Sequence, residues 1–246
     1  MSEAVCRALQ TSWAWRRGLS LTSNQLKLLA VAAMAFDHCM VTFVPHGLAL
    51  YPLLRLPGRL TAPIMCFLLA EGYYHTSNLK RYMGRLFGMA LVSHLPFTLC
   101  FGNDPWAFWR ATDVMWSLLL GLIALTAYLH KSWRPWKRAA AVLLCCLLSY
   151  PADWNYIAVL MVLGFGVLHG ERDLQTAAHL GVGGLYLAQG VLYGAALATR
   201  IGIFLSIPLL RHYNGQRGRK SKAIQWRFYW FYPLHLAALC LFKQLS

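Results

Sequence analysis

The sequence predicts an all-α protein, a polytopic membrane helical bundle of about nine transmembrane helices. Two observations predict this fold class. Apolar residues make up 58% of the 246 residues and charged residues only 13%, which is more apolar surface than a soluble domain of this length needs. The apolar residues also gather into segments long enough to cross a bilayer, and short polar turns separate these segments.

The apolar segments follow one another along most of the chain. Residues 1–24 contain arginines but no apolar core of signal-peptide length, so we expect a cytoplasmic N-terminal segment and a first helix retained as an anchor. Turn chemistry such as Pro57-Gly58 separates later segments. Several segments are short or interrupted, so the sequence allows eight to ten crossings. The nine expected helices cover residues 25–44, 59–75, 82–101, 113–129, 137–152, 154–169, 174–192, 195–211 and 225–243.

The distribution of Lys and Arg supports this division and gives its orientation. With the N-terminus in the cytoplasm, eighteen of the 23 basic residues fall on the cytoplasmic side, as membrane proteins generally show. The formal net charge of +15 therefore needs no nucleic-acid partner, and we expect membrane lipids as partners instead. No repeat, low-complexity tract or linker divides the chain, so we predict a single transmembrane domain over residues 25–246.

We expect no metal cofactor, because the cysteine spacing and the sequence motifs indicate no metal site. The seven cysteines are scattered through the chain without a CxxC pair, which argues against both a disulfide framework and a zinc site. The sequence also contains no HExxH metal motif, no GxSxG nucleophile elbow and no Walker-type phosphate loop.

Asp37 and His38 lie in the outer half of the first expected helix. A charge at that depth costs on the order of several kcal/mol unless it faces the bundle interior or a wet cavity. A buried imidazole stays neutral and can accept a proton from an attacking amine or hydroxyl. We therefore predict that His38 is a general base and that Asp37 orients it or balances charge. The alternative is a hydrogen-bonded pair that holds two helices together.

Polar residues in other segments indicate a cavity through the bundle. Arg59 enters the second segment from outside, and His235 lies near the middle of the last. Taken singly, Arg59 also fits an interfacial residue. The remaining polar residues inside or at the ends of apolar segments are Glu71, His75, His94, Asp113, Asp153 and His179.

The segment 211–227 carries six basic residues around a turn before the last helix. Arginine forks and helix N-terminal amides suit phosphates, so the segment is a candidate anion site on the cytoplasmic side. The alternative is a topogenic loop that attracts anionic lipid. The residues considered for anion binding are Arg217, Arg219, Lys220 and Lys222.

The order of these motifs resembles the TraX family of membrane proteins. The resemblance covers most of residues 25–240 through stretches at 27–40, 58–76, 82–97, 117–125, 209–220 and 228–236. Matching positions are Asp37 and His38 for an Asp-His signature, Arg59 for Gly-Arg, Glu71 for Glu-Gly, Tyr213, Asn214 and Gly215 for Tyr-Asn-Gly, and His235 for Tyr-Pro-x-His. Departures are His94, Asp113 and the triplet Asp153, Trp154 and Asn155.

TraX-like proteins are implicated in N-terminal acetylation of pilin, and the family is similar to larger transmembrane acyltransferases. The resemblance therefore implies a multi-pass protein of the bacterial inner membrane that moves an acetyl group from cytoplasmic acetyl-CoA to a pilin N-terminus or an envelope glycan. In that reaction His38 would be the base, and Arg59 or His235 would stabilise the oxyanion. Direct transfer and an acetyl-histidine intermediate both fit.

In this hypothesis acetyl-CoA, the acyl donor, places its phosphates at the inner basic loop and extends its pantetheine arm outward through the bundle. That arm spans roughly half of the ~30 Å hydrocarbon thickness, which suits a site near or beyond the midplane. The residues assigned to donor binding are Glu71, Tyr213, Asn214, Arg217, Arg219, Lys220 and Lys222.

Two other classes of function are compatible with the sequence. A proton-coupled transporter or flippase would also place acidic residues and histidines along a pathway, but it should contain inverted repeats or broken helices, which we do not expect here. A non-catalytic pilus-assembly protein would explain the hydropathy but not the buried polar groups. The sequence leaves the acceptor open.

Overall fold

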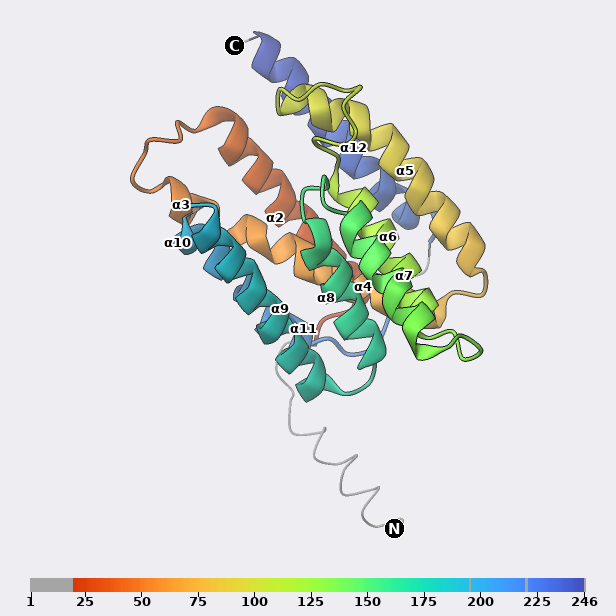
Figure 1. The fold of residues 1–246 in the computed structure, drawn as a ribbon. Coiled ribbons are helices and arrows are strands. Elements are labelled where there is room, and N and C mark those ends of the chain that lie inside the picture. Colours follow the sequence, from red (N-terminus) through yellow and green to blue (C-terminus); the bar gives the residue numbers. More distant parts are fainter. Residues whose placement is uncertain (1–19, 195, 220, 246) are drawn as a thin grey trace.

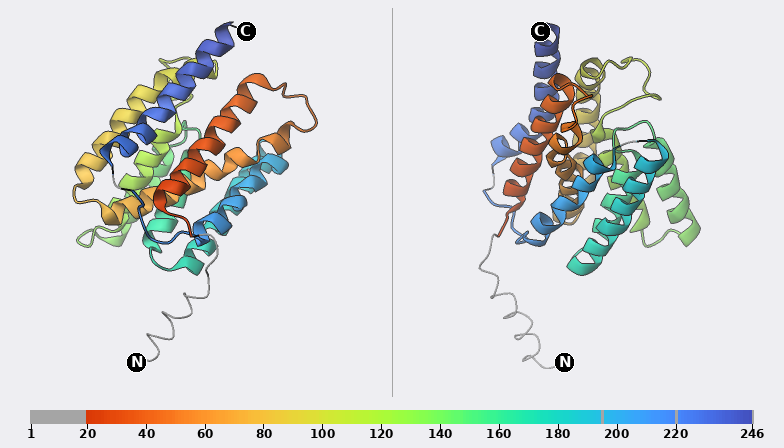
Figure 2. Two further views of the ribbon diagram at one scale, coloured as in Figure 1. Left: turned by 180° about the vertical axis from the view of Figure 1, so that it is seen from behind. Right: turned by 90° about the vertical axis from the view of Figure 1, so that its left-hand side faces the viewer.

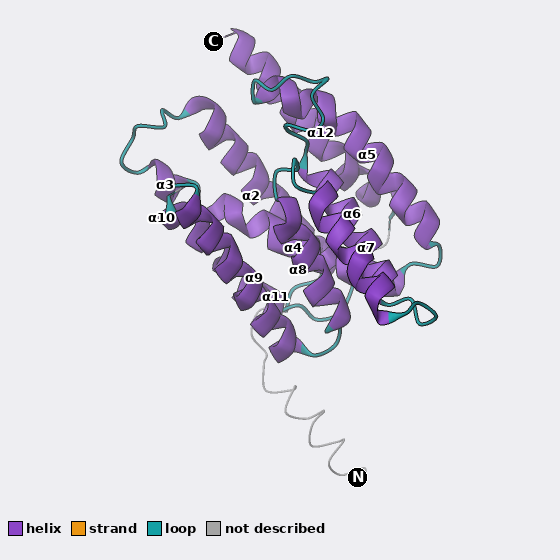
Figure 3. Cartoon of the chain, viewed as in Figure 1, coloured by secondary structure: helices purple, strands orange, loops and turns teal. Residues whose placement is uncertain are grey.

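The protein is built from helices, and the all-α prediction is confirmed (Figures 1 and 3). The computed structural model describes residues 20–194, 196–219 and 221–245. The elements within these ranges are α2 (Ser23–Phe43), α3 (Tyr51–Leu54), the 3-10 helix η1 (Pro57–Leu60), α4 (Thr61–His75), α5 (Leu79–Cys100), α6 (Val114–Tyr128), α7 (Pro135–Leu148), α8 (Asn155–Val167), α9 (Arg172–Leu192), α10 (Leu197–Arg200), the 3-10 helix η2 (Ile201–Leu205), α11 (Ser206–Arg211) and α12 (Lys222–Leu245).

Helix starts follow the local side-chain chemistry. The hydroxyl of Thr22 accepts a hydrogen bond from the Gln25 N–H, and the Gln25 side chain accepts one from the Thr22 N–H at 2.8 Å, which forms a capping box at the start of α2. Asn78 and Asp113 cap α5 and α6 through their side chains. Most long helices begin and end within a few residues of the segments predicted from hydropathy.

The expectation of one continuous eighth helix over residues 195–211 is wrong. The chain is divided there into α10, η2 and α11. Pro208 has no N–H to donate to the carbonyl of Phe204, so a regular helical bond is lost. In η2, Gly202 lies so close to η1 that a Cβ would be 2.5 Å from the Leu56 carbonyl oxygen. This close approach places η2 directly against the turn that carries Arg59.

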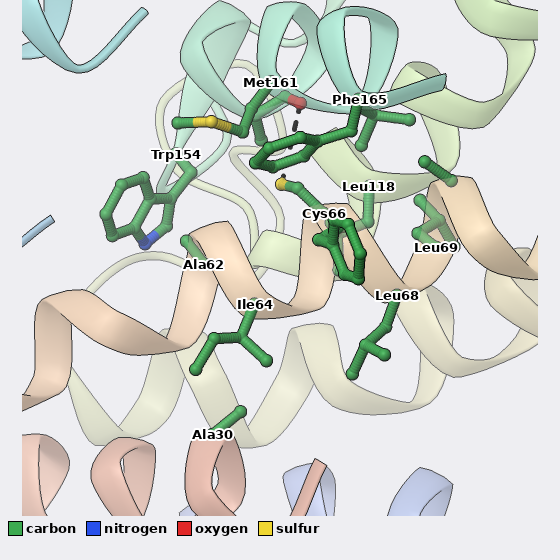
Figure 4. Packing of buried hydrophobic residues seen from close by; sticks show 14 of the residues in the cluster. Ala30, Ala62, Ile64, Cys66, Leu68, Leu69, Leu118, Trp154, Met161 and Phe165 are labelled. Carbon is green, nitrogen blue, oxygen red and sulfur yellow. Dashed lines mark hydrogen bonds between the residues drawn. The ribbon is translucent and has the colours of Figure 1, made fainter. Parts of the chain in front are cut away.

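α4 lies in the middle of the bundle and forms much of its core. It packs against α2 on one side and α8 on the other, and also contacts α6 (Figures 1 and 4). Ala62 and Ile64 are buried, and the thiol of Cys66 points to the Ala158 carbonyl at 3.7 Å. Because α4 is held on several sides, the preceding turn η1 is fixed relative to α2.

Two helical stretches, Ser23–Phe43 and Tyr51–His75, are long and apolar enough to cross a membrane. α6 and α8 are also apolar but shorter. Large apolar side chains also lie on the outside of the bundle, for example Leu28 and Leu91, which are more than half exposed.

The start of α2 and the end of α12 lie at opposite ends of the bundle (Figure 2). Residues 212–219, which we call the basic loop, pair with the chain that leads into α2. The Leu21 N–H donates to the His212 carbonyl at 2.9 Å, and the Ser23 N–H donates to the Gln216 carbonyl at 2.8 Å. The basic loop and the first turn of α2 therefore form one surface at the same end of the molecule.

Candidate functional site

A cavity of about 610 Å³ follows α2 and is walled by α4, α5 and α12. Its lining on α2 extends from Ser23 to Val41, which is ~27 Å at 1.5 Å per residue. The middle of the cavity is lined by apolar side chains such as Met34 and Met65. The cavity therefore joins the end of the bundle that carries the basic loop to the polar residues deep in α2.

The deep end of the cavity is organised around Asp37. Arg55 donates to both carboxylate oxygens, from Nε and Nη2 at 2.9 Å each, and the Nη2 of Arg59 donates at 2.8 Å. Arg59 also donates to the Tyr186 hydroxyl at 3.2 Å and lies over the Trp154 ring. Because two arginines share one buried carboxylate, Asp37 fixes the guanidinium groups where they line the cavity.

Asp37 reaches these arginines because small residues let α2 approach its neighbours. It continues a buried stripe of α2 formed by Leu26, Ala30 and Ala33. The Asp37 side chain lies directly against Gly58 in η1, and a Cβ on residue 58 would overlap it. The position of the carboxylate therefore depends on a glycine in the facing turn.

A Gly58→Ala substitution should consequently destabilise the protein by roughly 1 to 3 kcal/mol, because the added methyl must displace the Asp37 carboxylate. Thermal unfolding of the purified protein in detergent would measure the loss. The matched control is Gly84→Ala in α5, where a Cβ meets nothing within 4 Å. An unchanged melting temperature in the Gly58 variant would show that the turn adapts and does not position Asp37.

His38 lines the cavity next to Asp37, and its ring is bonded to His235 of α12. The Nδ1 of His38 lies 2.7 Å from the Nε2 of His235, and the Nδ1 of His235 lies 2.9 Å from the Phe231 carbonyl oxygen. The two imidazoles are parallel to within 1° with centroids 5.0 Å apart. That separation is the N–N distance plus two ring radii, so the rings meet edge to edge in one plane rather than face to face.

The other end of the cavity is basic. Lys27 of α2, Arg85 of α5 and Arg217 of the basic loop all line it. None of the three has an ion-pair partner within the described part of the chain. Lys27 and Arg85 lie over aromatic rings, 5.9 Å from the centroid of Phe228 and 5.6 Å from that of Tyr82. Three cations and the single carboxylate of Glu71 therefore give this part of the cavity an excess of positive charge.

The residues assigned to donor binding from the sequence are not all in one place. Glu71, Tyr213 and Arg217 line the cavity, whereas Asn214 and Arg219 do not. Asn214 accepts the Gln216 N–H at 2.9 Å, and the Arg219 carbonyl accepts from the Asn24 side chain. Lys220 and the side chain of Lys222 lie outside the described residues. The basic loop thus contributes one described arginine to the cavity and uses other residues to hold its own shape.

Glu71 and Tyr213 also border a second cavity of about 300 Å³ between α4, α9 and α11. Glu71 pairs with His169 at 3.0 Å, so its carboxylate already has a partner. Burial, followed by the nearby Glu71 carboxylate, raises the pKa of Tyr213 to about 12, and the phenol therefore stays neutral at physiological pH. Tyr213 can offer a hydrogen bond but no charge.

Three other polar residues have structural partners instead of a place in the cavity. His94 bonds to the Pro105 carbonyl at 3.0 Å and stacks on Phe108. Asp113 accepts from the Ser93 hydroxyl and caps α6. His179 bonds to a backbone carbonyl of η2 at 3.2 Å. These contacts give each of the three residues a structural partner, although the Nδ1 of His94 is buried without a hydrogen-bond partner in the described part of the chain.

The residues predicted from the sequence do not include three that line the cavity, namely Arg55, Lys27 and Arg85. Lys27 lies three turns before His38 and therefore on the same face of α2, but the sequence does not show that this face lines a cavity. Arg55 precedes Arg59 by four residues, but its loop looks interfacial in sequence. Nothing local distinguishes Arg85 from the basic residues that precede it.

Comparison with known proteins agrees with the motif order. No solved structure matches the chain. A protein of Dichelobacter nodosus described as a probable fimbrial assembly protein, FimC, serogroup H1, is 34% identical over 244 residues, covering 92% of this chain and 98% of the relative. The family model described as TraX protein matches residues 22–243. The chain therefore belongs to the TraX family.

Proposed function

We propose that this protein is an integral membrane acetyltransferase that moves an acetyl group from cytoplasmic acetyl-CoA to an amine or hydroxyl at the outer half of the bacterial inner membrane. The observation that carries the proposal is the cavity that joins the basic end to the Asp37 and His38 cluster. An acyl-CoA donor needs positive charge for its phosphates and a base at its thioester. Basic side chains and the imidazole of His38 line the same cavity.

Nine crossings with a cytoplasmic N-terminus fit the arrangement of the helices. Counting α10, η2 and α11 as one discontinuous crossing gives an odd number, which places the start of α2 and the end of α12 at opposite ends (Figure 2). Exposed leucines such as Leu147 and Leu241 lie on the outside, where lipid would cover them. In this orientation the basic end of the cavity faces the cytoplasm.

The residues at the basic end fit an acidic donor. Lys27, Arg85 and Arg217 would hold the phosphates of acetyl-CoA, which supplies an activated acetyl thioester when bound. Lys27 and His38 are eleven residues apart on α2, a separation of ~16 Å along the axis. The pantetheine arm spans roughly half of the ~30 Å hydrocarbon thickness, so the two groups lie about one arm apart. Apolar side chains such as Met34 and Met65 line the middle of this path.

At the deep end each residue has a separate task. His38 takes the proton of the attacking amine or hydroxyl. Arg55 uses Nε and Nη2 for Asp37, which leaves Nη1 to donate to the carbonyl oxygen as negative charge develops there. Asp37 holds Arg55 and Arg59 and offsets part of their charge. Its role is thus to position the arginines rather than His38, with which no hydrogen bond is formed.

The acceptor we infer is a component of the pilus or of the envelope. The Dichelobacter nodosus relative is described as a probable fimbrial assembly protein, and its alignment spans almost the whole of both chains. An acetylated pilin amino terminus would connect that description with acyl-transfer chemistry. An envelope glycan offers a hydroxyl or amine of the same reactivity.

Neutralising the basic end should weaken donor binding. Lys27→Gln and Arg85→Gln are each expected to lower the affinity for acetyl-CoA by about ten- to a hundredfold, as expected for a lost charge-assisted hydrogen bond. The measurement is the rise in melting temperature with acetyl-CoA concentration in detergent. Arg81→Gln is the control, because Arg81 lies on α5 like Arg85 but is exposed and does not line the cavity. Equal stabilisation of all three variants by acetyl-CoA would contradict the assignment.

A second candidate function, transport, is favoured by the discontinuous segment α10–η2–α11, since transporters often bind substrate at broken helices. The two functions differ in their product. In proteoliposomes that contain the acceptor, an acetyltransferase releases free CoA thiol in step with acetylation. A transporter changes the location of its substrate without cleaving the thioester.

A further inference from the structure

We infer that His235 is a positioning residue that holds His38 in the tautomer with the proton on Nδ1, so that Nε2 is the atom that accepts the proton of the acceptor. The inference rests on the proposed acyl transfer for its catalytic consequence, although the tautomer itself can be measured without any reaction. It follows from two consecutive hydrogen bonds in α12 and between α12 and α2.

The first bond fixes the proton on His235. A backbone carbonyl oxygen only accepts hydrogen bonds, so the contact of His235 Nδ1 with the Phe231 carbonyl at 2.9 Å requires the hydrogen on Nδ1. In a neutral imidazole one nitrogen donates and the other accepts. His235 Nε2 is therefore an acceptor.

The second bond transmits this choice to His38. The 2.7 Å contact between His38 Nδ1 and His235 Nε2 needs one proton, and His235 has none to offer on that side. His38 must donate from Nδ1, which leaves the lone pair of its Nε2 without a hydrogen-bond partner in the described part of the chain. The in-plane meeting of the two rings directs the lone pair of one nitrogen along the N–H of the other.

His235 acts through His38 and does not itself face the cavity in which a substrate would bind. His38 lines the cavity, whereas His235 does not. Both nitrogens of His235 are used, one by Phe231 and one by His38, so this ring has no N–H left for a substrate oxygen. Of the two residues that the sequence suggested for the oxyanion, only Arg59 lines the cavity, and it stands beside Arg55.

The fixed tautomer determines the path of the proton during acyl transfer. The proton of the acceptor N–H or O–H moves to His38 Nε2 as the acceptor atom forms its bond to the acyl carbon. The carbon–sulfur bond breaks, and the departing thiolate takes the proton back from Nε2. Throughout, His38 Nδ1 keeps its hydrogen bonded to His235, and the imidazolium formed in between is stabilised by that acceptor. The products are the acetylated acceptor and the free thiol.

Two substitutions separate this role from packing. His235→Gln places an amide oxygen near the position of the ring Nε2 and can still accept from His38, whereas His235→Leu cannot. We expect the leucine variant to acetylate the envelope about a hundredfold more slowly than wild type, and the glutamine variant to stay within about tenfold of it. A glutamine variant as slow as the leucine variant, or a leucine variant as fast as wild type, would overturn the inference.

The tautomer is read directly by nitrogen-15 NMR of the full-length protein with labelled histidine, with the His38 signals assigned by their loss in His38→Asn. In the wild-type protein near neutral pH we expect a protonated Nδ1 and a bare Nε2 on His38. In His235→Leu the Nε2-protonated form should appear. A bare Nδ1 in the wild type would overturn the inference. The expected spectrum in a protein that transfers no acetyl group would instead reject the proposed function and leave the hydrogen-bonded pair intact.

Discussion

A His38→Ala variant is expected to lose acetyl transfer while it inserts and folds like the wild type. Removal of a general base typically lowers a rate by 10²- to 10⁴-fold, and acetylation of cell-envelope proteins and glycans should therefore fall below detection by mass spectrometry. Folding should survive because His38 contributes one hydrogen bond, to His235, and its other neighbours are cavity space and aromatic edges.

The matched control is His46→Ala. His46 follows α2 closely in sequence, is exposed and does not line the cavity, so its removal should leave acetylation unchanged. The variants must be compared at equal amounts in the membrane. Full acetylation by the His38 variant would refute its role as base, and a loss caused by both variants would indicate a defect in insertion.

The second large effect is expected from Asp37→Ala. This change leaves the guanidinium groups of Arg55 and Arg59 without their shared carboxylate at a site where Arg59 is only 14% exposed. Breaking a buried ion pair by removing one partner typically costs ~3 to 5 kcal/mol, because the remaining charge is buried without compensation. Thermal unfolding in detergent should show the loss as a clearly lower melting temperature.

A compensating variant distinguishes charge from packing. When Arg55 and Arg59 are both replaced by Met in the Asp37→Ala background, stability should recover in large part, because the two buried guanidinium charges are removed together with the carboxylate that they shared. Activity should not recover, since the donors to the substrate oxygen are gone. The control Asp173→Ala breaks an exposed pair with Arg211 and should change stability little. A triple variant as unstable as Asp37→Ala would mean that the aspartate acts through shape rather than charge.

The sequence predicts the deep end of the site better than the basic end, for physical reasons. Asp37 and His38 are conspicuous because titratable groups are costly in an apolar helix and need an explanation. Lys27 lies near a helix end, where a lysine can extend to the interface, so it raises no such question. Its place on the cavity face follows only once that face is known.

Long-range pairing is the part that a single sequence cannot supply. His38 and His235 are 197 residues apart, and nothing local to either residue indicates that their rings meet. The interruption at η2 has a local signal in Pro208, but it also depends on a long-range contact. Residues 195–211 are apolar enough for one helix, but the chain bends where Gly202 packs against the backbone of η1. Hydropathy detects where a segment is buried and not which backbone it touches.

The most direct test of a donor path along α2 is a cryo-electron microscopy structure of the protein in lipid nanodiscs with saturating acetyl-CoA. We expect phosphate density beside Lys27 and Arg85, an arm along Met34 and Met65, and the thioester within hydrogen-bond distance of Arg55 and of an acceptor atom at His38 Nε2. Acetyl-CoA bound elsewhere, or a cavity filled by lipid at saturating donor, would contradict it.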